Sequence, residues 1–205
     1  MPEVTTEAYA PIRLTTYYPV VSKYPYTGHS ELKIPIDRTT WYDYTGEKEF
    51  PERVLPYVTI DKKSRASDYN LVTNNCADAT LNYLNKAFNT HESPMLFTTP
   101  GDVRDYAIHK LHGKLIHNNN GSDTVLIPRN ARNKTKISKE ALDLYSNSPK
   151  GTVRFGYNAH FKKGKDSGIK EYASNEDIHI NPDGSITTRN GNTGSVILPD
   201  VNVHA

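Results

Sequence analysis

The chain has little cysteine and no long apolar segment. Of its 205 residues, one is a cysteine and one is a tryptophan. A single cysteine cannot form an internal disulfide, which is typical of synthesis in a reducing compartment. No run of about 18 apolar residues is present, so the sequence predicts no membrane insertion. The N-terminal region lacks a basic stretch followed by an apolar stretch, so we expect no signal peptide.

The chain also lacks a strong charge of either sign. The formal net charge is +2, and basic residues are scattered except in the segment 162–170. No broad basic face is predicted, which argues against a nucleic-acid partner. The hydrophobic fraction is only 36%, but 14 tyrosines can bury apolar area while keeping a polar tip. A globular domain with its own core is therefore expected.

Helical patterns lie in the middle of the chain and strand patterns flank them, which predicts an α+β fold. Apolar residues at helical spacing predict helices that begin near residues 76, 100 and 138. Residues 29–36 alternate in polarity, and with 41–45 they predict a two-stranded hairpin. The segment 50–60 contains two prolines and predicts a loop with a short strand. After residue 151, strand patterns alternate with turns, including a hairpin across "NPDG".

The only cysteine, Cys76, lies where the first predicted helix begins. Asn74 and Asn75 are good N-cap residues, and Asp78 suits the positive end of the helix dipole. The first turn of a helix stabilises a thiolate, and its N–H groups can form an oxyanion hole. The alternative interpretation is a small buried residue, which is the commoner role for a cysteine.

A nucleophilic cysteine needs an imidazole that exchanges its proton and later protonates the leaving group. His29 lies on the predicted strand 29–36, which we expect beside the N-terminus of the cysteine helix. Cys76 and His29 therefore form a candidate catalytic pair. The alternative is an ordinary solvated histidine on a strand.

Three motifs follow one another along the chain: "GHSELKI" at 28–34, "NNCAD" at 74–78 and "TTPGD" at 98–102. Their order resembles the circularly permuted papain-like families, relatives of NlpC-type cell-wall peptidases and lecithin–retinol acyltransferases, in which the histidine strand precedes the cysteine helix. The resemblance implies a permuted catalytic domain over residues 1–150, with an antiparallel sheet packed on the cysteine helix. Residues 151–205 are then a β-rich C-terminal extension, or they complete the same domain.

The resemblance implies that Cys76 is the nucleophile and that His29 is the general base and acid. These families often place a third polar residue on the strand after the histidine, where it orients the imidazole. Asp43 is our choice, and Glu47 or Asp37 fits if the hairpin register differs. Tyr69 could offer a hydroxyl to the oxyanion, although a core position is the expectation for this side chain.

The expected function is a cysteine amidase or endopeptidase that cleaves peptidoglycan stem peptides as an antibacterial effector of the type VI secretion kind. The resemblance implies no cofactor and no metal, and as partners a stem peptide, a cognate immunity protein and a component of the secretion apparatus. We expect synthesis in the cytoplasm and action in the target-cell periplasm. The alternatives are an acyltransferase or protease that acts on host proteins with the same Cys–His site, and a non-catalytic binding module.

The remaining histidines carry weaker signals. His109, His112 and His117 have a spacing that can bind zinc, but no HExxH motif is present, so a polar helix face is expected. His160 and His179, with Asn190, loosely suggest a nuclease site in the C-terminal strands.

Overall fold

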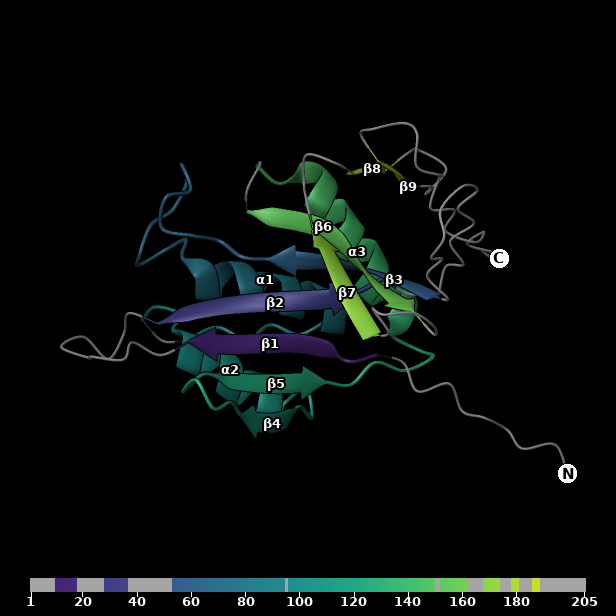
Figure 1. Cartoon of the computed structure of the whole chain (residues 1–205). Coiled ribbons are helices and arrows are strands. Elements are labelled where there is room, and N and C mark those ends of the chain that lie inside the picture. Colours follow the sequence, from purple (N-terminus) through teal and green to yellow (C-terminus); the bar gives the residue numbers. More distant parts are fainter. Residues whose placement is uncertain are drawn as a thin grey trace, which may run out of the picture.

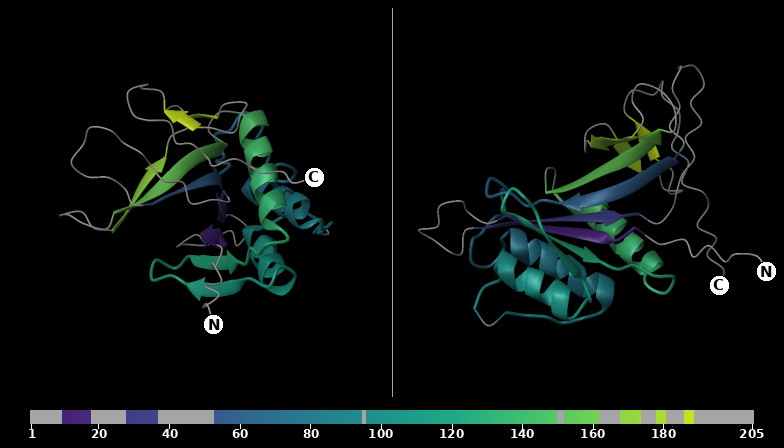
Figure 2. Two further views of the ribbon diagram at one scale, coloured as in Figure 1. Left: turned by 90° about the vertical axis from the view of Figure 1, so that its right-hand side faces the viewer. Right: turned by 60° about the horizontal axis from the view of Figure 1, so that its bottom comes forward.

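The computed structural model describes residues 10–17, 28–36, 53–94, 96–149, 152–161, 168–173, 178–180 and 186–188. In this part of the chain, an antiparallel sheet of seven strands carries three helices on one face, so the predicted α+β class is confirmed (Figures 1 and 2). The strand order is β4–β5–β1–β2–β3–β6–β7. None of the described helices is long and apolar enough to cross a bilayer.

The main sheet brings together segments from both ends of the sequence. Its strands are β1 (Ile12–Tyr17), β2 (His29–Pro35), β3 (Arg53–Ile60), β4 (Lys114–His117), β5 (Asp123–Ile127), β6 (Val153–Phe161) and β7 (Gly168–Ala173). A separate pair, β8 (Ile178–Ile180) and β9 (Ile186–Thr188), forms the hairpin predicted across "NPDG". Residues 153–160 of β6 pair with β3, so residues beyond 151 contribute to the same sheet as β2.

Helix α1 (Cys76–Phe88) begins where the sequence predicts. The side chain of Asn75 accepts hydrogen bonds from the N–H groups of Ala77 and Asp78, and Asp78 accepts one from the N–H of Asn75. This reciprocal capping box satisfies donors that a helix start otherwise leaves unpaired. The local sequence therefore fixes Cys76 as the first helical residue.

Helix α2 (Pro100–His109) also begins at its predicted residue, because Thr99 and Asp102 form the same kind of capping box. Helix α3 (Lys134–Asn147) does not, since it starts about one turn before the predicted residue 138. Its N-cap residue, Asn133, makes no side-chain cap bond, and its first turn contains no acidic residue. The usual capping and charge signals that predict a helix start are therefore missing at the start of α3.

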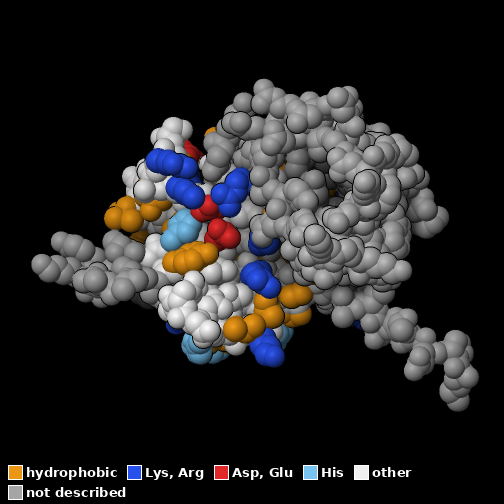
Figure 3. Space-filling model, in the orientation of Figure 1, with side chains coloured by type: hydrophobic (Ala, Val, Ile, Leu, Met, Phe, Trp, Pro, Cys, Tyr) orange, Lys and Arg blue, Asp and Glu red, His pale blue; other side chains and the backbone are white. Residues whose placement is uncertain are grey.

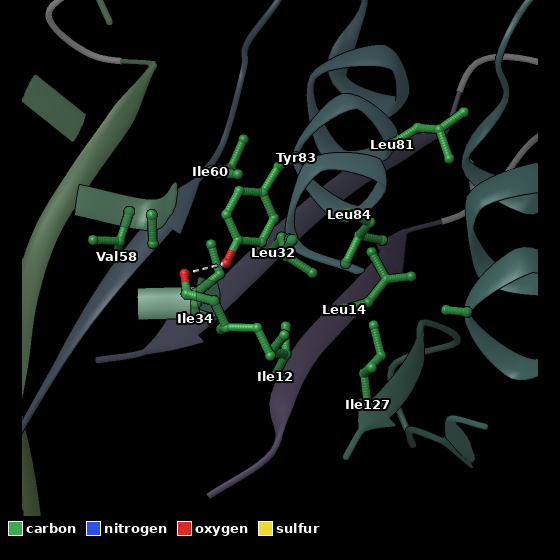
Figure 4. Packing of buried hydrophobic residues seen from close by; sticks show 14 of the residues in the cluster. Ile12, Leu14, Leu32, Ile34, Val58, Ile60, Leu81, Tyr83, Leu84 and Ile127 are labelled. Atoms are coloured by element: carbon green, nitrogen blue, oxygen red, sulfur yellow. Dashed lines mark hydrogen bonds between the residues drawn. The ribbon is translucent and has the colours of Figure 1, made fainter. Parts of the chain in front are cut away.

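The core lies between the sheet and the helices (Figure 4). Alternation along β1 and β2 turns Leu14 and Leu32 inward, where both are fully buried beneath Leu84 of α1. Each such side chain contributes about 1.5–3 kcal/mol through burial. The hydroxyl of Tyr83 donates to the carbonyl of Ile137 at 2.8 Å, which joins α1 to α3 and satisfies a buried polar group.

The strands beside β2 differ from the predicted hairpin. Residues 41–45 lie outside the described residues, and the described partners of β2 are β1 and β3. The segment 50–60 also contains more strand than the predicted loop with a short strand, because β3 extends over eight of its residues. Pro56 is tolerated there because its carbonyl, rather than an N–H, bonds to the N–H of Ile36.

Candidate active site

Cys76 lies at the point where α1 meets the beginning of β2. It is the first residue of α1 and is 4% exposed. Its thiol lies 3.9 Å from the carbonyl oxygen of Gly28, the residue before the histidine strand. The fold thus places the sulfur beside the residue that precedes His29.

Gly28 allows this close approach. A Cβ at this position would lie 2.7 Å from the carbonyl oxygen of Tyr17 and 3.3 Å from Cγ of Pro100. Because a real side chain cannot fit against a backbone oxygen at that distance, the position requires glycine. Gly28 thereby lets β1, β2 and the start of α2 converge next to Cys76.

His29 is held between Tyr17, Asp61 and Cys76. Its ring stacks on the Tyr17 ring with centroids 6.0 Å apart, and its Nε2 lies 2.6 Å from Oδ1 of Asp61. Hydrogen bonds to Asp61 and to Cys76, which outweigh the effect of burial, raise the pKa of His29 to about 9. The imidazole is therefore mostly protonated at neutral pH, and the structure brings the two predicted catalytic side chains together.

Asp61 directly follows β3 and is only 3% exposed. Burial by itself would raise the pKa of this carboxyl group. The hydrogen bond to His29 and the charges of His29, Arg154 and Lys63 outweigh burial and lower the pKa. Asp61 is therefore a carboxylate at neutral pH, as an acceptor that orients a catalytic imidazole must be.

Asp61, which bonds His29, was not among the carboxylates that the sequence suggested for this role. Asp43, Glu47 and Asp37 lie outside the described residues, so their roles stay predictions. The missed signal was the "VTID" sequence at 58–61, which sets an aspartate at the end of a strand. Ile60 pairs with Leu32 in the antiparallel β2–β3 ladder, so Asp61 leaves the sheet near the beginning of β2.

Two groups can stabilise an oxyanion at Cys76. The N–H groups of Ala77 and Asp78 already donate to Asn75 at 2.7 and 3.0 Å, but the N–H of Cys76, at the first helical position, has no acceptor within the helix. The predicted core position of Tyr69 is wrong, because its half-buried side chain lines the cleft. Burial, followed by the charges of Cys76 and Asp78, raises the pKa of Tyr69, so its hydroxyl remains a donor.

His29, Asp61 and Tyr69 line a cleft of about 570 Å³ at the beginning of β2. Its lining residues are Tyr17, Gly28, His29, Glu31, Asp61, Lys62, Lys63, Ser64 and Tyr69. On this face of the molecule, histidine, acidic and basic side chains gather next to one another over the sheet (Figure 3). The cleft has room for a peptide-sized group next to the histidine.

The other histidines do not assemble into a metal site within the described residues. No group of three His, Cys, Asp or Glu side chains there is placed to hold a metal ion. His117 instead bonds Asp123, with Nδ1 and Oδ1 2.6 Å apart. His160 lies on β6 and His179 on β8, while Asn190 lies outside the described residues.

Comparisons with protein-family models, with curated proteins and with solved structures give no match to this chain. The chemistry of the site therefore rests on its own geometry and on the motifs of the sequence.

Proposed function

We propose that the protein is a cysteine amidase or endopeptidase that hydrolyses amide bonds in peptidoglycan stem peptides, on a permuted papain-like core of the NlpC type. The observation that carries this proposal is the arrangement of His29 between a buried carboxylate and a helix-start cysteine, with Nε2 2.6 Å from Asp61. Cysteine hydrolases need this combination of nucleophile, base and orienting group.

In the first half of the proposed reaction, the Cys76 sulfur attacks the amide carbonyl. The Cys76 N–H and the Tyr69 hydroxyl stabilise the oxyanion of the tetrahedral intermediate. Because Nε2 of His29 bonds Asp61, the Nδ1 nitrogen is the one that serves the thiol and the leaving group. His29 gives its proton to the departing amine, the C–N bond breaks, and a thioester forms at Cys76.

In the second half, a water molecule replaces the amine in the cleft. Neutral His29 takes a proton from this water as its oxygen attacks the thioester carbonyl. The C–S bond then breaks, which releases a carboxylic acid and restores the thiolate–imidazolium pair. Asp61 stays ionised throughout and compensates the positive charge on His29 each time the imidazole is protonated.

The biological role follows from the same sequence resemblance. We propose that the enzyme is an antibacterial effector which a type VI secretion system delivers into the periplasm of a target cell. A cognate immunity protein that blocks the cleft would protect the producing cell. The stem peptide and this immunity protein are the proposed partners.

Digestion of purified peptidoglycan sacculi in H₂¹⁸O tests the reaction. We expect new fragments by mass spectrometry, each with one ¹⁸O in the newly formed carboxyl group, and no fragments from the Cys76→Ala variant. Intact sacculi after incubation with folded wild-type protein would contradict the proposed substrate. Products in which an added amine replaces water would instead indicate the acyltransferase alternative.

A further inference from the structure

Cations outnumber carboxylates around Asp61. Three cations contact its carboxylate: Nε2 of His29 at 2.6 Å, Nη1 of Arg154 at 3.0 Å and Nζ of Lys63 at 3.4 Å. The second carboxylate of the cluster is Glu31, whose Oε2 lies 4.0 Å from Nη2 of Arg154. With His29 protonated, this cluster holds one positive charge more than its carboxylates neutralise.

The three cations are not held equally. His29 and Arg154 occupy one oxygen of Asp61 each, and Arg154 also approaches Glu31. Lys63 makes the longest contact with Asp61, and its side chain is 48% exposed. Such exposed ion pairs contribute little stability, and a lysine ammonium turns freely on its four-carbon stem. Lys63 can therefore leave Asp61 at little cost.

Lys62, the residue before Lys63, cannot leave its partner in the same way. Lys62 also lines the cleft, but its side chain is 4% exposed and its Nζ bonds Asp68 at 2.8 Å. The ammonium of Lys62 is thus already committed, whereas that of Lys63 faces the solvent of the cleft. Of these two lysines, Lys63 is therefore the one that a bound substrate can reach.

We infer that Lys63 is a specificity-determining residue that binds a carboxylate of the substrate, so that the site prefers acidic peptides over their amidated forms. This inference rests on the proposed function and narrows its substrate class.

The test uses two synthetic stem peptides that are identical except that their free carboxylates are amidated in one. For wild-type protein we expect kcat/KM to be about five- to tenfold higher for the acidic peptide, mainly through KM. Lys63→Met should bring this ratio close to one, and Lys63→Arg should keep most of it. Lys139→Met is the matched control, because it removes the same charge from an exposed lysine that does not line the cleft.

Binding measurements separate the two possible failures. Affinities of both peptides are measured by calorimetry in a Cys76→Ala background, with and without Lys63→Met. If wild-type protein cleaves neither peptide but the Cys76→Ala protein prefers the acidic one through Lys63, the proposed reaction fails and the role of Lys63 stands. Equal affinity for both peptides, no binding of either, or a preference that survives Lys63→Met overturns the inference.

Discussion

Within the described residues, two His–Asp pairs have the same separation and very different surroundings. Nε2 of His29 and Oδ1 of Asp61 are 2.6 Å apart, as are Nδ1 of His117 and Oδ1 of Asp123. The His29 side chain is 32% exposed and lies beside Cys76 in a cleft, whereas His117 is 78% exposed at the β4–β5 edge of the sheet. Water competes for an exposed pair and weakens it. A short distance alone therefore does not make a site, and the neighbours of the pair decide its chemistry.

The largest expected difference between the pairs is the effect of removing each histidine. His29→Ala should lower turnover about 10,000-fold or more, because the thiol loses its base and the leaving group its acid. His117→Ala should leave turnover within about twofold of wild type, since surface substitutions away from such features have small effects. Rates on sacculi or on a stem peptide, measured for both variants, check this contrast. Equal losses in the two variants would remove His29 from its proposed role.

Replacing the two aspartates should give a smaller contrast. Asp61→Asn should lower turnover by about one to four orders of magnitude, because an amide holds the imidazolium less strongly than a carboxylate. Asp123→Asn serves as the matched control, and we expect it to change turnover little. Thermal unfolding of both variants separates a catalytic effect from lost stability. Unchanged turnover in Asp61→Asn would show that Asp61 does not orient the imidazole and would leave Asp43, Glu47 and Asp37 as the candidates.

The smallest expected effect is a shift in a titration. The pKa of His29 is raised to about 9, so its imidazole C–H resonances should titrate near that pH in NMR spectra. Asp61→Asn should move this midpoint toward the ordinary imidazole value of about 6.5, while Asp123→Asn should not move it. The raised pKa also stabilises the fold, and this contribution is complete below about pH 6.5 and lost as the pH rises through 9. A His29 midpoint near 6.5 in wild-type protein would refute the ion pair.

The two helix starts that frame the site could be predicted from the sequence because their signals are local. Each capping box spans four residues, Asn75 to Asp78 in one helix and Thr99 to Asp102 in the other. The alternation of β2 is equally local. These signals were enough to place Cys76 at a helix start and His29 on a strand.

The carboxylate that bonds His29 could not be predicted in this way. Asp61 lies 32 positions from His29 in the sequence, and its place depends on which strand pairs with β2 and in what register. A shift of one residue in that register would turn a different side chain toward the histidine. The proline at position 56 favoured a loop prediction for the segment that forms β3. The hairpin of β4 and β5 was not predicted, because both strands are short.

The contact between Arg154 and Asp61 has a consequence for synthesis of the chain. Arg154 lies on β6, which reaches the site only by pairing with β3 across almost one hundred intervening residues. During translation, His29, Asp61 and Cys76 leave the ribosome before β6 has been made. At that stage the chain lacks the Arg154 guanidinium that contacts the buried Asp61 carboxylate. The complete charge network therefore assembles only after about three quarters of the sequence has been translated, and a polypeptide cut short before β6 cannot build it.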